Sequence, residues 1–150
     1  MLKASVLHPE IIGHLARAGH LSTVLITDGN YPHATKPNPR APIVWANYRP
    51  GLLDGPTVLG LICDLVPVEA ITVMEPERTG PYAMSDDPPV WDVYRDVLKD
   101  KAGFADPFLP LQKPEFNAAA QADDLALVVA TGETAIFANV LVTIGVVQPR

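Results

Sequence analysis

The chain has 150 residues, of which 48% are hydrophobic and 19% charged, and its formal net charge is −6. This length suits one domain spanning residues 1–150 with a hydrophobic core of its own. The acidic balance and the lack of a Lys/Arg cluster argue against nucleic acid or an anionic membrane surface as a partner. The charged fraction is below the roughly 25% of typical domains, which indicates that part of the surface is covered in a homo-oligomer.

Hydrophobic spacing and capping residues predict helices over 9–18, 56–65, 89–98 and 116–121, and strands over 23–27, 43–46, 69–74, 125–130 and 139–147. Proline-rich loops follow at 31–40, 76–88 and 103–114. Helices and apolar strands alternate along the chain. The expected fold class is therefore α/β, with three layers and helices on both sides of a largely parallel central sheet.

The predicted compartment is the cytoplasm. The single Cys63 lies in an apolar run, where we expect it to act as a small buried hydrophobe that needs no oxidising environment. The first residues lack the apolar region of a secretory signal. No apolar run approaches the about 20 residues of a membrane span.

The stretch from Ala18 to Pro32 carries the first candidate site. His20 precedes the predicted strand over 23–27, and Asp28 follows it. Ligands of open α/β sheets lie beyond the carboxyl ends of strands, so the turn from Asp28 to Tyr31 is the expected binding region. A strand of six to seven residues is roughly 20 Å long, at about 3.3 Å per residue. Either the chain bends before the strand, or His20 and Asp28 meet in a site shared between subunits.

The residues exclude several chemistries. Neither a glycine-rich phosphate loop nor a GxSxG elbow is present. The four histidines lack the spacing of metal ligands, and no metal or cofactor is expected. Acid–base chemistry by His20 remains. The same residues also fit structural roles: His20 suits a helix C-terminus, Asp28 and Glu133 suit turns, and Asn139 suits a bond to the backbone.

Landmark segments in a fixed order extend this interpretation over nearly the whole chain. They are Met1-Leu2-Lys3, Ala18-Gly19-His20, Asp28-Gly29-Asn30-Tyr31-Pro32, Val73-Met74-Glu75, Pro89 to Tyr94, Val128 to Asn139 and Gly145-Val146. Together they resemble the ribose pyranase and fucose mutarotase family (RbsD/FucU), and the fucose branch more closely. The resemblance implies the family's fold and a cofactor-independent isomerase that interconverts sugar anomers, or pyranose and furanose rings. It also implies a ring-like homo-oligomer, often a decamer, with sites at subunit contacts.

The resemblance also implies roles for single residues. His20 corresponds to the proton donor, Asp28 to a ligand of the sugar hydroxyls, and Phe137 and Asn139 to the aromatic-x-Asn sugar ligands. Phe137 lacks the hydroxyl of the family's Tyr. Lys113 takes the place of the family's basic ligand if two residues are inserted after it.

The loop from His33 to Arg49 is longer and richer in proline than in the family, and it either reshapes the mouth of the site or packs against a neighbouring subunit.

The first hypothesis is a monosaccharide mutarotase acting on L-fucose or a related aldose, with His20 as general acid and base. The alternatives are a non-catalytic sugar-binding or sensor protein of this fold, and a D-ribose pyranase-type isomerase.

Overall fold

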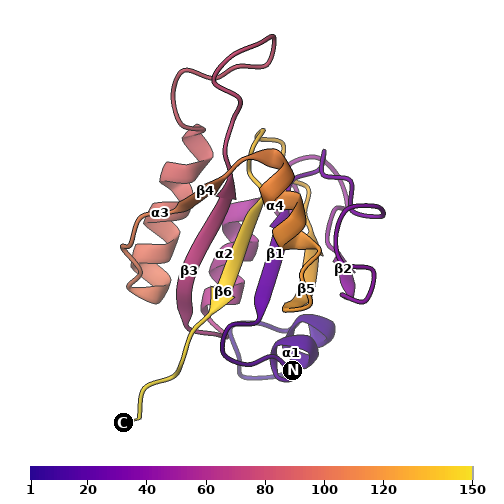
Figure 1. The fold of residues 1–150 in the computed structure, drawn as a ribbon. Helices are drawn as coiled ribbons and strands as arrows, with labels where there is room; N and C mark the ends of the chain where they lie inside the picture. Colours follow the sequence, from indigo (N-terminus) through magenta and orange to yellow (C-terminus); the bar gives the residue numbers. More distant parts are fainter. Residues whose placement is uncertain (150) are drawn as a thin grey trace.

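The computed structural model describes residues 1–149, which form four helices around one six-stranded sheet (Figure 1). In chain order the elements are α1 (Pro9–Leu15), β1 (Thr23–Thr27), β2 (Ile43–Trp45), α2 (Gly55–Cys63), β3 (Val68–Met74), α3 (Pro89–Ala102), β4 (Leu109–Leu111), α4 (Lys113–Ala120), β5 (Leu125–Ala130) and β6 (Val140–Ile144). None of these helices has the length and apolar character needed to cross a membrane.

The strand order is β2-β5-β1-β6-β3-β4. Five strands run in one direction, and β6 runs antiparallel to both of its neighbours, β1 and β3. The sheet is thus largely parallel, as predicted, with one reversed strand in its interior. The reversal follows from the connection between β5 and β6, which spans only residues 131–139 and contains no helix. Joining parallel strands takes a longer crossover, so this short segment returns the chain antiparallel.

The predicted three layers are present, and each face of the sheet has its own hydrophobic cluster. Helices α1, α2 and α3 pack on one face, where Val24 and Ile26 of β1 point. Helix α4 packs on the other face, where Leu25 points together with Phe116 of α4. The side chains of Val24, Leu25 and Ile26 are all fully buried. A strand covered on both faces has this continuous apolar run, without polar alternation.

Element boundaries differ from the predicted ones where local chemistry decides them. Helix α1 ends at Leu15 rather than at 18, and the N–H of Ala18 bonds to the carbonyls of both His14 and Leu15 in a turn. Helix α3 extends to Ala102 because Gly103, with φ of +63°, takes the left-handed conformation that ends it. Strand β4 was not predicted, because Pro110 lies at its centre. Proline is tolerated there because β4 is an edge strand.

Candidate functional site

A cavity of about 980 Å³ opens at the carboxyl ends of the parallel strands. Asp28 follows β1 and Glu75 follows β3, while Asn139 directly precedes the reversed strand β6, so the topology brings all three to this edge. Lys113, the first residue of α4, and Phe137 also line the cavity. The structure therefore brings together four of the five predicted site residues: Asp28, Lys113, Phe137 and Asn139.

Asp28 and Asn139 form a reciprocal pair at the base of the cavity. The Asn139 amide donates to Asp28 Oδ2 at 3.0 Å, and Asn139 Oδ1 accepts the backbone N–H of Asp28 at 2.9 Å. Asp28 Oδ1 accepts the N–H of Asn30, also at 2.9 Å. Both side chains of the pair are nearly buried. The pair holds a carboxylate and an amide in fixed positions, which suits them to bind adjacent hydroxyl groups.

Burial raises the pKa of the Asp28 carboxyl above its ordinary value of 3.8. Hydrogen bonds from the backbone at Asn30, Ala138 and Tyr31 and from the Asn139 side chain oppose this increase. Desolvation destabilises the charged form, while N–H donors stabilise it. Asp28 is thus a carboxyl whose charge depends on an intact set of donors.

Phe137 has a φ of +56°, an uncommon conformation for a bulky residue without glycine's freedom. Two aromatic side chains of α3 hold the segment in place. Trp91 Nε1 donates to the Phe137 carbonyl at 3.1 Å, and the Tyr94 hydroxyl donates to the Ala138 carbonyl at 2.7 Å. These bonds fix the backbone that presents Asn139 to the cavity. Trp91 is a buried core residue and also has this polar role.

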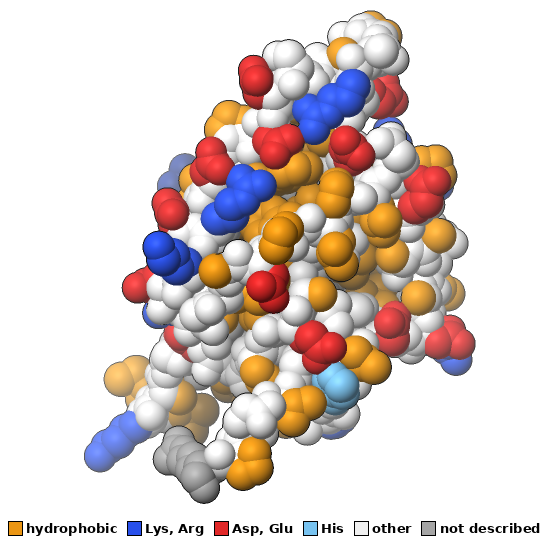
Figure 2. Space-filling view, turned by 60° about the vertical axis from the view of Figure 1, so that its left-hand side comes forward, with side chains coloured by type: hydrophobic (Ala, Val, Ile, Leu, Met, Phe, Trp, Pro, Cys, Tyr) orange, Lys and Arg blue, Asp and Glu red, His pale blue; other side chains and the backbone are white. Residues whose placement is uncertain are grey.

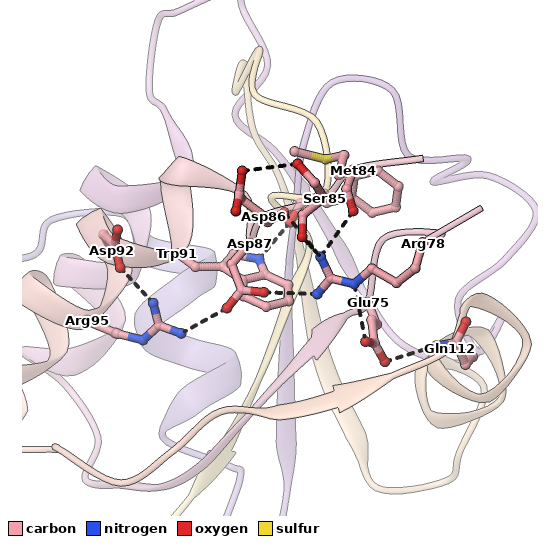
Figure 3. A network of polar contacts seen from close by, with 11 residues as sticks. Glu75, Arg78, Met84, Ser85, Asp86, Asp87, Trp91, Asp92, Arg95 and Gln112 are labelled. Atoms are coloured by element: carbon pink, nitrogen blue, oxygen red, sulfur yellow. Dashed lines mark hydrogen bonds and ion pairs between the residues drawn. The ribbon is translucent and has the colours of Figure 1, made fainter. Parts of the chain in front are cut away.

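The segment 76–88, predicted as a loop, forms one rim of the cavity through Glu77, Tyr82, Ala83 and Met84. Figure 3 shows the Arg78 guanidinium at the centre of this loop, where it donates to the carbonyls of Met84 and Asp86 and to the Asp87 carboxylate. Glu75, also near Arg78, accepts a hydrogen bond from Gln112 at 2.9 Å. Arg78 thus ties both ends of the rim loop together.

His20 lies at the opposite edge of the sheet. Its Nε2 is 2.6 Å from Glu69 Oε2 at the start of β3, and both side chains are about half exposed. Between His20 and Asp28 stands all of β1, whose five residues span about 17 Å. One subunit therefore does not bring His20 into the cavity that holds Asp28, which agrees with the length argument from the sequence.

His33 lies behind the turn that carries Asp28 and lines a separate cavity of about 550 Å³. Its Nε2 is 2.7 Å from Thr27 Oγ1, and its ring packs edge-on against Tyr31 and Trp45. Burial lowers the pKa of His33, so the ring is neutral near neutral pH. His33 thus supports the turn that carries Asp28. Trp45 and Tyr48 of the long loop are exposed and do not line the cavity at Asp28.

Glu133, which the sequence assigns to a turn, is a structural residue rather than a solvated one. The side chain is buried and accepts backbone N–H groups from Gly55, Thr134 and Ala135. A carboxylate at the first turn of α2 is favoured by the unpaired N–H groups and the helix dipole. Glu133 thus fastens α2 to the connection between β5 and β6.

Asn30 lines the cavity and lies in the predicted binding turn from Asp28 to Tyr31. The sequence did not single out five other lining residues: Lys36, Glu75, Tyr82, Gln112 and Asn117. Glu75 directly follows β3, so its place at the carboxyl end of a strand was the signal that could have found it. Within residues 1–149, no three His, Cys, Asp or Glu side chains cluster as ligands of a metal ion.

The chain matches the family described as "RbsD / FucU transport protein family" over residues 1–147. The chain belongs to the RbsD/FucU family. It is 31% identical to a fucose mutarotase of Danio rerio, over 97% of this chain and 93% of the relative. It is 28% identical to D-ribose pyranase 1 of Rubrobacter xylanophilus, over 97% and 98% of the two chains. The crystal structure of FucU from Bifidobacterium longum has a TM-score of 0.78, with 28% identity and coverage of 94% and 95%.

Proposed function

We propose that this RbsD/FucU member is a cofactor-independent monosaccharide mutarotase that acts on L-fucose or a related aldose. The observation that carries the proposal is the convergence of Asp28, Lys113, Phe137 and Asn139 on one cavity at the carboxyl edge of the sheet. Its volume lies within the about 300–1,000 Å³ of small-molecule sites. Relatives named fucose mutarotase and D-ribose pyranase support the same reaction class.

The lining fits a sugar on two sides. Asp28 and Asn139 supply polar atoms for hydroxyl groups, and the Lys113 ammonium adds three donors. Met74, Met84 and Ile136 contribute an apolar wall. That wall suits the methyl group of a 6-deoxy sugar such as L-fucose, while a pentose such as D-ribose has no methyl to bury.

Anomer exchange needs two proton movements. A proton must reach the ring oxygen while another leaves the anomeric hydroxyl, which opens the ring; rotation about the C1–C2 bond and the reverse transfers close it. An imidazole exchanges protons efficiently near neutral pH, so His20 is the proposed general acid and base. Asp28 and Asn139 orient the sugar so that the reacting oxygens face this group.

In this proposal His20 reaches the sugar of a neighbouring subunit, because the cavity of its own subunit lies at the other edge of the sheet. A homo-oligomer, of which a decameric ring is one form, supplies that neighbour. Large exposed hydrophobic side chains such as Leu21 beside His20 and Leu109 on the edge strand β4 support such contacts. Figure 2 shows hydrophobic side chains gathered in the middle of one face, with charged side chains around them. A cytoplasmic location remains the prediction from the sequence.

Exchange NMR tests the activity directly. Saturation transfer between the anomer signals of L-fucose, then of D-ribose and other aldoses, should exceed the uncatalysed rate with the wild-type protein. His20→Ala should abolish the acceleration and leave the oligomer intact, while the matched variant His14→Ala, in helix α1 away from the cavity, should keep it. Full activity in His20→Ala would refute the assigned role. Saturable sugar binding by the wild type without faster exchange would instead indicate a non-catalytic sugar-binding protein.

Subunit mixing tests the shared site. His20→Ala and Asp28→Asn should each be inactive alone. When the two are unfolded together and reassembled, random mixing should combine an intact His20 with an intact Asp28 from another subunit in roughly a quarter of the sites. Activity should therefore return to about that fraction. No recovery in verified mixed oligomers would mean that one subunit supplies both residues.

A further inference from the structure

Tyr31 lines the proposed sugar cavity and carries a buried hydroxyl that has no hydrogen-bond partner. Among the described residues, two buried side-chain groups lack a hydrogen-bond partner: the hydroxyls of Thr23 and Tyr31. Thr23 lies at the start of β1, at the far edge of the sheet. Tyr31 lines the cavity at Asp28, and only 5% of it is exposed. A buried hydroxyl without a partner is costly, and one beside a ligand cavity calls for an explanation.

The surroundings fix the ring but leave the hydroxyl unbonded. The Tyr31 ring belongs to the hydrophobic cluster under α4, and His33 packs edge-on against it with ring centroids 5.8 Å apart. The Tyr31 N–H bonds to the Asp28 carbonyl at 3.3 Å, so the tyrosine and the sugar-binding carboxyl share one turn. Phe137, which packs against the same cluster, has no hydroxyl to offer. Tyr31 therefore carries the phenolic group at this wall.

We propose that the Tyr31 hydroxyl is a further ligand of the sugar and that it forms its hydrogen bond only when the cavity is filled. This inference rests on the proposed function. Met74 and Met84 line the same cavity, and their unbranched side chains change rotamer at little cost. In this proposal, a small rearrangement of the cavity wall exposes the hydroxyl to the ligand. The hydroxyl then donates to a sugar oxygen. Burial raises the pKa of Tyr31 to about 12, so the donor proton is present near neutral pH.

Substitution Tyr31→Phe separates binding from folding. It removes one oxygen and keeps the ring, so the midpoint of thermal unfolding without sugar should be equal to or higher than that of the wild type, because an unpaired buried group is removed. The dissociation constant for the sugar, from NMR titration, should rise by about tenfold, the usual value of one hydrogen bond. KM should rise by a similar factor, with a smaller change in kcat, since orientation by Asp28 and proton transfer by His20 remain.

Two tyrosines provide matched controls. Tyr94→Phe breaks the bond to the Ala138 carbonyl and should lower the unfolding midpoint, in contrast to Tyr31→Phe. Tyr48→Phe removes an exposed hydroxyl outside the cavity and should change neither midpoint nor affinity. With monodeoxy analogues of the sugar, the one that lacks the hydroxyl facing Tyr31 should bind equally to wild type and Tyr31→Phe.

The outcomes distinguish this inference from the proposed function. If the wild type binds and exchanges a sugar and Tyr31→Phe binds it with unchanged affinity, the inference is wrong and the proposed function stands. If Tyr31→Phe unfolds earlier than the wild type and binds normally, the hydroxyl has a structural partner and the inference is again wrong. If the wild type neither binds nor exchanges any aldose, both fail.

Discussion

The pair of Asp28 and Asn139 makes a prediction that tests folding and function together. Asn139→Ala removes both hydrogen bonds of the pair, leaving Asp28 Oδ2 and the Asp28 N–H without these partners in a nearly buried place. A hydrogen bond to a charged group contributes about 1.5–3 kcal/mol, and an orphaned buried N–H costs about 1–3 kcal/mol. The free energy of unfolding should therefore fall by about 3 kcal/mol or more. For a chain of this length, that lowers the melting temperature by about 6–12 °C.

Asn38→Ala is the matched control for this loss. Asn38 is also a buried asparagine, and it bonds to the carbonyls of Gln121 and Ala122 and to the N–H of Arg40, outside the sugar cavity. Calorimetry should show a comparable loss of stability in both variants. NMR titration with L-fucose, well below either melting temperature, should show weakened binding only in Asn139→Ala. A melting temperature of Asn139→Ala within about 2 °C of the wild type, or equal loss of sugar binding in Asn38→Ala, would refute the reasoning.

The protonation of Asp28 and the close packing at Gly132 lead to two further predictions. Because burial raises the native pKa of Asp28 above 3.8, its contribution to stability is fully present below pH 3.8 and is lost as the pH rises through the native pKa. The unfolding free energy of the wild type minus that of Asp28→Asn, from urea titrations, should therefore decrease with rising pH across this window. A difference that is flat or increases contradicts the burial argument. Gly132→Ala places a Cβ against the carbonyl oxygens of Arg49 and Leu52 and should destabilise the protein by about 3 kcal/mol. Gly13→Ala, with open space around it in α1, should instead stabilise the protein by about 0.5–1 kcal/mol. Equal melting temperatures for the two variants would count against the close approach at Gly132.

Strands with strong local signals were predictable from the sequence. The bounds of β1 and β5 are those expected, because each is a run of apolar residues buried on both faces and ended by polar turn residues. Strand β4 was not predicted, because the Leu-Pro-Leu run at 109–111 has no strand signal of its own and becomes a strand only through its tertiary pairing with β3. The reversal of β6 was open to prediction from the short connection at 131–139, although strand order was not.

The site was partly predictable for the same reason. Asp28 and Asn139 lie at element ends, where sequence pattern and topology agree, and the resemblance to the RbsD/FucU family pointed to both. The supports of the site could not be read from the sequence. Trp91 and Tyr94 appear there as apolar residues at helical spacing, and only the packing of α3 against the segment 137–138 reveals their bonds to its carbonyls. The unpaired hydroxyl of Tyr31 likewise emerges only when every neighbour is in place.

The position of His20 links the fold to the proposed assembly. Residues that precede and follow one parallel strand emerge at opposite edges of the sheet, and no change of loop conformation shortens the five residues of β1 between them. Glu69 at the start of β3 shares the edge with His20, whereas Glu75 just after β3 shares the cavity with Asp28. The two edges thus carry complementary halves of the proposed chemistry, a proton-transfer group and a sugar cradle. In the proposed oligomer, a second copy places its His20 edge over the cavity, completes the site and covers exposed hydrophobic side chains by the same contact.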